Sequence, residues 1–183
     1  MKVLKFLFSK LHIFVLWLLF SAFFWAWIFT FLTDTAPEKK VTVFISAYGL
    51  RDTELAVELE KDMPEGLKMV KVHPFSYAMF EEQSILGADI FIVKDSEAEG
   101  YMDSFARVPL PEGYEYYMKD GEPRGVLIYD AQTGRGGAAD FITYPAPDGS
   151  TENYYLFFGV ESLHTGDADD AAFRVARLLL GLE

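Results

Sequence analysis

The sequence contains no cysteine. This absence excludes disulfide bonds, thiolate metal sites, a cysteine nucleophile and a lipid anchor carried on cysteine. It leaves the compartment open, because a domain without disulfides can also fold outside the cell. Basic residues are scarce as well: 16 Lys and Arg stand against 28 Asp and Glu, which gives a formal net charge of −12. An acidic surface repels nucleic acid and anionic lipid headgroups, so we expect no nucleic-acid partner.

Charged residues are missing altogether from the 23 residues at positions 11–33. As a helix this stretch is about 34 Å long, enough to cross a hydrocarbon core of about 30 Å. Three lysines and no acidic residue precede it, and the positive-inside rule then predicts a cytoplasmic N-terminus. A cleaved signal peptide is the alternative. The apolar stretch exceeds the ~7–15 residues usual for one, and Pro37 makes the bond after Ala36 a poor cleavage site.

These features divide the chain into four parts. We expect a cytoplasmic tail at 1–10, a transmembrane anchor helix at 11–33, a linker at 34–40 and an extracytoplasmic domain at 41–183. The lipid bilayer is then a partner of the first helix, and the protein is a single-pass protein of the cell membrane. Past residue 40 the imbalance of charge is sharper, with 11 Lys and Arg against 26 Asp and Glu.

Strand and helix patterns alternate in the first half of the domain. Apolar or alternating runs predict strands at 41–49, 67–75 and 88–93. A helix is expected from Asp52 or Thr53, ending near Pro64 and Gly66, and a short one at 76–86. This order implies a three-layer α/β domain with a mostly parallel sheet and right-handed crossovers.

The second half is richer in turn formers. The expected elements are a hairpin at 114–130 that turns at Asp120-Gly121, a long loop at 131–153 with one strand at 140–144, a strand at 154–160 and a helix at 170–182.

Motifs of known chemistry are weak in this sequence. His73 ends a strand and His164 precedes a helix cap, and neither has the spacing of a metal site, so both are interpreted as structural or solvated. The glycine-rich 134–137 is interpreted as a turn, since no Gly-Lys-Ser/Thr follows it. Asp167, Asp169 and Asp170 suit a helix cap better than a calcium loop. We therefore predict no enzyme activity, no metal and no cofactor.

The position of polar residues in the fold offers a better clue. In open parallel sheets, ligands bind beyond the carboxyl ends of the strands. Five residues at these ends are candidate ligand-binding residues: Ser46, Tyr48 and Gly49 after the first strand, and Asp95 and Ser96 after the third. Their hydroxyls, carboxylate and aromatic ring suit a small polar solute such as a sugar or an amine. The alternative is that they only form turns and caps, for which the same residue types are needed.

Three segments resemble one known family. ILGADIFIVKDSE (85–97), MKDGEPRGVLIYD (118–130) and YYLFFGVESLHTGDADDAAFRVARLLL (154–180) are similar to parts of the extracellular solute-binding proteins of ABC importers, the type II periplasmic-binding-protein class. Those receptors have two lobes that close on a solute. Only 23 residues separate Asp130 from Tyr154, too few for a second lobe, and the lipid-anchoring cysteine is replaced by a helix. The resemblance therefore implies a single lobe, which would bury little of a ligand.

Three functions remain open at this point. The first is a membrane-anchored, solute-binding-protein-like domain without catalytic activity, which binds a small polar solute near Tyr48 and Asp95 or docks on a membrane transporter. The second is a structural or interaction ectodomain of a membrane complex with no small ligand and an exposed apolar patch around Tyr114, Tyr116 and Tyr117. The third is an extracytoplasmic hydrolase that uses a pair of carboxylates.

Overall fold

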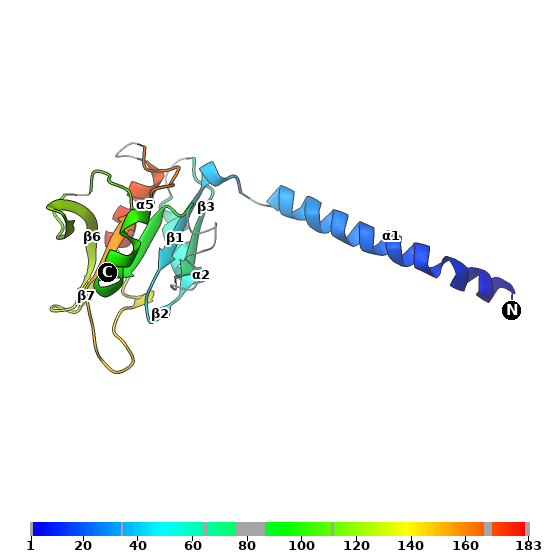
Figure 1. Cartoon of the computed structure of the whole chain (residues 1–183), viewed down its shortest axis with the longest axis horizontal. Coiled ribbons are helices and arrows are strands. Elements are labelled where there is room, and N and C mark those ends of the chain that lie inside the picture. The colour runs from blue at the N-terminus through cyan, green and yellow to red at the C-terminus, as the bar shows by residue number, and fades with distance from the viewer. Residues whose placement is uncertain are drawn as a thin grey trace. The chain divides into compact units, whose positions relative to one another are not determined.

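The computed structural model describes residues 2–33, 35–63, 66–75, 87–110, 112–166 and 170–181. The chain separates into two compact units, Met1–Thr35 and Ala36–Glu183 (Figure 1). The first unit holds the helix α1, Lys2–Thr33. Its segment Lys10–Thr30 has a mean hydropathy of 2.1, long and apolar enough to cross a membrane. This helix is compatible with a membrane anchor or with a signal sequence.

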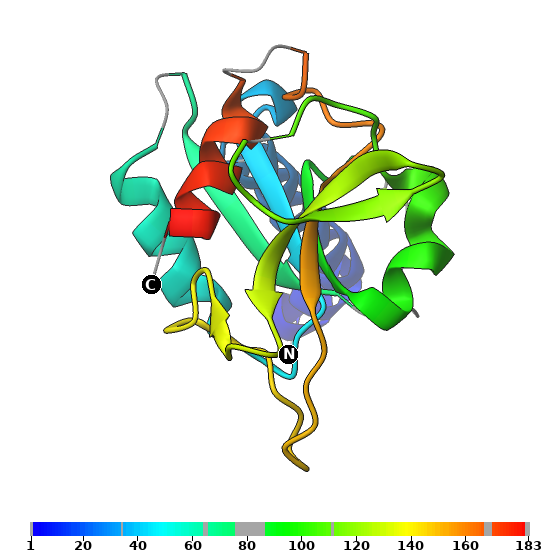
Figure 2. The same cartoon turned by 90° about the vertical axis from the view of Figure 1, so that its left-hand side faces the viewer.

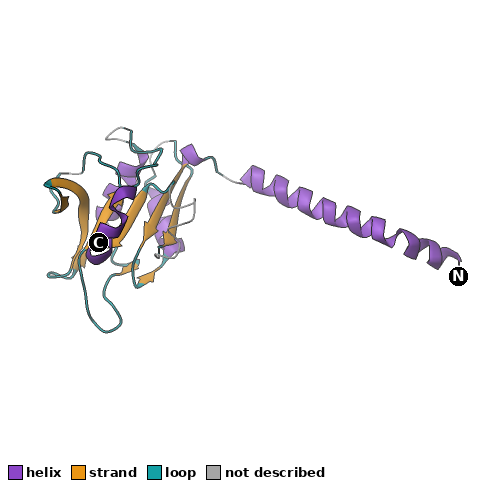
Figure 3. Cartoon of the chain, in the orientation of Figure 1, coloured by secondary structure: helices purple, strands orange, loops and turns teal. Residues whose placement is uncertain are grey.

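The second unit is built on one seven-stranded sheet, which follows the short 3-10 helix η1, Pro37–Lys39. Its strands, orange in Figure 3, stand in the order β3-β1-β4-β9-β6-β5, and β7 pairs with β6. The strand bounds are β1 Lys40–Ile45, β3 Met69–Pro74, β4 Ile90–Lys94, β5 Tyr116–Lys119, β6 Glu122–Asp130, β7 Arg135–Gly136 and β9 Tyr154–Phe158.

The sheet is parallel in one half and antiparallel in the other. β1 pairs in parallel with β3 and with β4, as the alternating pattern of the first half predicts. β9 is antiparallel to β4 and β6, and β5 and β7 are antiparallel to β6. The expectation of a mostly parallel sheet is therefore corrected to a mixed one. The physical reason is that a tight hairpin can only join antiparallel strands, and Asp120 and Gly121 form its turn with φ of 54° and 81°.

Helices cover both faces of the sheet and give the three layers that the sequence predicts (Figure 2). On one face lie α2, Asp52–Lys61, and α5, Ala171–Gly181, whose Leu59 and Leu179 are buried in the larger core cluster. On the other face lie α4, Asp95–Ala98, and η3, Glu99–Ser104, over a second cluster that is mostly aromatic. Both clusters lie wholly within the second unit, so we expect residues 36–183 to fold without the apolar helix.

Several elements differ in detail from the sequence-based expectation. The strand expected at 41–49 is divided into β1 and a short β2, Gly49–Leu50, which pairs with β8, Ile142–Thr143. The strand expected at 140–144 is therefore present but only two residues long. α4 and η3 were not expected, because neither carries an amphipathic repeat. The helix expected at 76–86, Pro64 and the residues Asp167 and Asp169 lie outside the described residues.

Candidate functional site

The five residues predicted from the sequence gather at the carboxyl ends of β1 and β4. Ser46 is buried, and its Oγ donates a hydrogen bond of 2.7 Å to Glu97 Oε2 in α4. Tyr48 is half-exposed, and the ammonium of Lys94 lies 4.1 Å from the centre of its ring. The same ammonium lies 3.8 Å from Glu97 Oε1. The parallel arrangement thus brings the end of β1 and the start of α4 into one polar cluster.

The other three predicted residues serve the local backbone. Gly49 pairs with Thr143, and an added Cβ would lie 3.0 Å from the hydroxyl of that threonine. The amide of Asp95 donates to the carbonyl of Asn153 at 2.9 Å, and the amide of Ser96 to the carboxylate of Glu152 at 3.1 Å. In this carboxyl-end cluster, the side chains of Ser46 and Lys94 are already engaged with Glu97, and Lys94 also with the ring of Tyr48. Binding of a solute there stays a prediction.

The next strand adds buried phenols beside this cluster. Burial raises the pKa of Tyr154, and the nearby Tyr48, Glu152 and Glu97 raise it further. The Tyr154 hydroxyl donates to the carbonyl of Tyr144 at 2.9 Å. This phenol is therefore neutral across the physiological range and acts as a structural hydrogen-bond donor.

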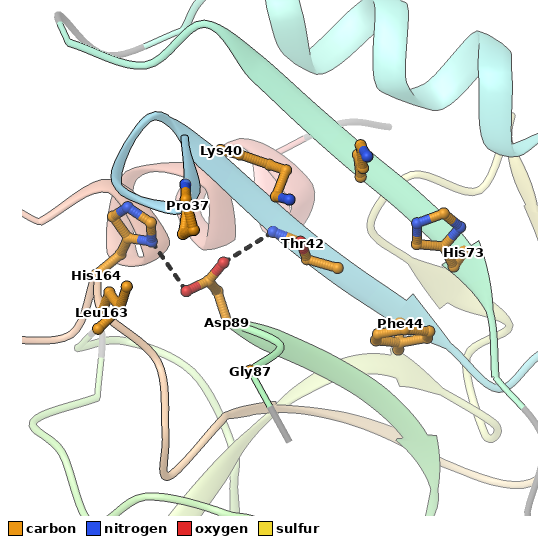
Figure 4. A pocket seen from close by; sticks show the side chains of 10 residues that line it. Pro37, Lys40, Thr42, Phe44, His73, Gly87, Asp89, Leu163 and His164 are labelled. Atoms are coloured by element: carbon orange, nitrogen blue, oxygen red, sulfur yellow. Dashed lines mark hydrogen bonds and ion pairs between the residues drawn. The ribbon is translucent and has the colours of Figure 1, made fainter. Parts of the chain in front are cut away.

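A cavity of about 510 Å³ runs along one face of β1 and β3, from Lys40 at the amino end of β1 to Phe44 and His73 near the carboxyl ends of the two strands (Figure 4). Its walls come from η1, β1, β3, the residues just before β4 and the segment that precedes α5. The lining residues are Pro37, Lys40, Thr42, Phe44, Lys71, His73, Gly87, Asp89, Leu163 and His164. We call this space the amino-end cavity. Sequence reasoning did not find it, since its residues are spread over five segments that only the fold brings together.

Asp89 is the buried centre of the polar network beside this cavity. The residue is only 3% exposed, although it directly precedes the apolar strand β4. One carboxylate oxygen accepts the backbone N–H of Thr42 at 2.8 Å. The other accepts the hydroxyl of Ser162 at 2.6 Å and faces Nδ1 of His164 at 2.9 Å. These bonds satisfy a carboxylate that would be costly to bury alone.

His164 is buried and paired, in agreement with its interpretation as a structural histidine. Its backbone amide donates to the Ser162 hydroxyl at 3.0 Å, so the network closes on itself. Nε2 of the ring is buried and has no hydrogen-bond partner among the described residues. The sequence signal that points here is a lone Asp in the apolar run 88–93, because a carboxylate on a buried strand needs partners.

Ser162, His164 and Asp89 have the residue types of a hydrolytic triad but not its connections. In such a triad the histidine takes the proton of the serine hydroxyl. Here the hydroxyl and the imidazole both bond to the same oxygen of Asp89. This arrangement holds three chain segments together, and the Ser162 hydroxyl donates to Asp89 instead of to the imidazole. Across the parts of the chain that the structure describes, no group of three or more His, Asp or Glu could hold a metal ion.

His73 lies on the other side of the amino-end cavity from His164 (Figure 4). Its ring is 5.4 Å from that of Phe44, centre to centre. Although His73 is exposed, partial desolvation of its ring lowers its pKa, and the positive charges of Lys71 and Lys40 lower it further, against an opposing effect of Asp52. The two lysines of the cavity therefore produce a positive electrostatic potential at the His73 ring.

A second cavity of about 550 Å³ lies between η3 and the β5–β6 hairpin. Its charged lining residues balance in sign: Glu99, Asp103 and Asp120 against Arg107, Lys119 and Arg124. The Arg124 guanidinium is buried and donates to the carbonyl of Phe105 at 2.9 Å. Lys119 and Glu99 form an ion pair. This cavity thus has no net charge to select a ligand.

Fold and site together define a mixed α/β domain, preceded by an apolar helix, in which the amino-end cavity has both apolar and cationic lining residues. No protein-family model matches the sequence, and no curated protein matches it significantly. The likeness to solute-binding proteins therefore stays a resemblance of short segments.

Proposed function

We propose that the protein is a membrane-anchored, extracytoplasmic binding domain without catalytic activity, and that the amino-end cavity takes a small polar solute. The observation that carries the proposal is this cavity of about 510 Å³, within the range of about 300–1,000 Å³ typical of small-molecule sites. Polar lining groups stand beside apolar ones, as small-molecule recognition requires. The anchor would keep the bound solute close to a membrane transporter, on which the domain could dock.

The first support is the mixed lining of the cavity. Lys40, Lys71 and His73 provide polar groups, while Phe44 and Leu163 provide apolar contact surface. Leu163 is 65% exposed, so its side chain is accessible to a bound solute.

The second support is that the cavity wall is held firmly. The Asp89 network joins β1, β4 and the segment before α5 through three side-chain hydrogen bonds. A wall that is ordered before binding loses less entropy when a solute arrives, and affinity rises accordingly.

Native mass spectrometry of residues 36–183, purified without a denaturing step, tests the proposal. We expect an added mass of a few hundred daltons, or one that appears after incubation with sugars, polyamines or amino acids. The variant Thr42→Tyr places a ring in the cavity and should abolish the added mass. Thr53→Tyr, on the exposed face of α2, is the matched control and should keep it.

Two other outcomes of this experiment would refute the proposal or part of it. An added mass that survives in Thr42→Tyr would refute the amino-end cavity and favour the carboxyl-end cluster, for which Tyr48→Ala is then the informative variant. Bare protein under all conditions would refute solute binding. It would leave the alternative of a structural or interaction ectodomain with no small ligand.

The alternative, an interaction ectodomain, would use the exposed apolar surface around Tyr114. Tyr114 and Met118 are 39% and 55% exposed, whereas Tyr117 packs edge-on against Tyr155 with ring centres 5.3 Å apart. The predicted apolar patch is thus smaller than the three tyrosines suggest, because one of them belongs to the strand packing.

A further inference from the structure

Positive charge is concentrated at one edge of an otherwise acidic domain. Past residue 40 the chain carries 26 Asp and Glu against 11 Lys and Arg. Lys39 and Lys68 are exposed at the amino ends of β1 and β3, where the amide of Lys68 donates to the carbonyl of Lys39 at 2.8 Å. Lys40 and Lys71 follow on the same two strands and line the amino-end cavity.

These lysines carry charge that the described residues do not neutralise. None of the ion pairs among the described residues includes Lys40 or Lys71. Among the described residues, Asp89 is the one acidic residue that lines the cavity, and both of its oxygens are bonded to other groups. An anion that entered would therefore meet the ammonium groups of two half-buried lysines, which no described residue pairs with.

We propose that the solute of this cavity is a phosphate ester, with Lys40 and Lys71 as the residues that bind its phosphate. The proposal rests on the proposed function and names its ligand class. Two separate lysine point charges suit a phosphate, which has several charged oxygens, whereas a planar carboxylate is better matched by the fork of an arginine. Phe44, Leu163 and Pro37 line the same cavity and would contact the organic part of the ester.

The behaviour of His73 agrees with this ligand class. The same two lysines lower the pKa of His73, after the larger effect of burial. A bound phosphate would offset their field, so the pKa of His73 should rise when the ligand binds. The chain has only three histidines, and the proton spectrum of this ring can be assigned with a His73→Gln variant.

A phosphate ester could come from solution or from a phospholipid headgroup. Glycerol phosphate and glycerol form a matched pair of probes for residues 36–183, because they differ only in the phosphate. We expect glycerol phosphate to bind and to raise the pKa of His73, and glycerol to do neither. Vesicles of phosphatidylglycerol, compared with vesicles of phosphatidylcholine, probe the lipid source by co-sedimentation.

Matched variants locate the contacts. In K40Q/K71Q, affinity for the probe should fall at least about tenfold for each lysine removed. Lys61→Gln, on α2 away from the cavity, should leave it unchanged. Lysine-dependent binding of glycerol phosphate alone assigns a soluble ester, and lysine-dependent sedimentation with phosphatidylglycerol assigns a lipid headgroup.

Three results would overturn the inference. One is equal binding of glycerol and glycerol phosphate, a comparison that needs only the unchanged protein. Another is phosphate binding that K40Q/K71Q retains while the variant stays folded by circular dichroism. The third is an uncharged solute that binds the unchanged protein but not Thr42→Tyr, while neither phosphate probe binds. In that case the proposed function stands and only the ligand class is wrong.

Discussion

Replacing Asp89 with Asn should destabilise the domain strongly, although the two side chains have almost the same shape. Asp89 accepts from Thr42 through one oxygen and from Ser162 and His164 through the other. An asparagine has one carbonyl oxygen, so its amide group must face either the Thr42 N–H or the other two donors. One or two charge-assisted bonds are lost, each worth about 1.5–3 kcal/mol.

We therefore expect the free energy of unfolding of residues 36–183 to fall by about 2–4 kcal/mol in Asp89→Asn. For a domain of this size, the thermal midpoint would fall by roughly 5–15 °C. Urea unfolding followed by circular dichroism measures the change. Asp140→Asn is the control, since this aspartate is exposed and should change stability by about 0.5 kcal/mol at most. Equal effects of the two variants would refute the view that the Asp89 network holds the sheet to the segment before α5.

Three further effects follow from single contacts. The Tyr144 hydroxyl is buried and donates to a backbone carbonyl at 2.6 Å, so Tyr144→Phe should cost about 1–2 kcal/mol in urea unfolding, and the exposed Tyr114→Phe close to nothing. A Cβ at Gly159 would lie 2.0 Å from a backbone oxygen, so Gly159→Ala should lower the free energy of unfolding by about 2–3 kcal/mol or prevent folding. At Gly100 a Cβ would meet no atom within 4 Å, so Gly100→Ala should be tolerated. Expression and thermal melting of the two variants measure the difference. The pKa of His73 is lowered in the folded state, so the unfolded state binds the proton more readily. The free energy of unfolding should therefore rise with pH just below the usual titration range of histidine. Thermal melts at a series of pH values should show a flatter rise in His73→Gln, and the same rise in both proteins would contradict this prediction.

The strands of the first half could be predicted from the sequence because each is a compact apolar run. β1, β3 and β4 lie within a few residues of the expected positions, and their parallel pairing follows from the helix between the first two. β9 was also expected as a strand. Its place in the sheet was not predictable, since the apolar run 154–158 fits either direction equally and only the packing against β4 and β6 decides.

The two candidate sites also differ in how far each could be predicted from the sequence. The carboxyl-end residues could be found from the sequence, because parallel strands end at one edge and the following residues must meet there. The amino-end cavity could not, because its residues come from positions as distant as Lys40 and His164. Asp89 was the one visible signal, and its meaning depends on partners 47 and 75 residues away.

The two ends of the sheet also differ in how far their polar side chains are already bonded within the protein. At the carboxyl end, Ser46 is bonded to Glu97, and Lys94 is shared between that carboxylate and the ring of Tyr48. A solute there would have to replace existing contacts, and its net gain would be small. At the amino end, no described residue forms an ion pair with the ammonium group of Lys40 or Lys71. Because an interaction gains most where the protein has not already supplied a partner, a charged ligand is better served by the amino-end cavity than by the edge that strand direction alone would favour.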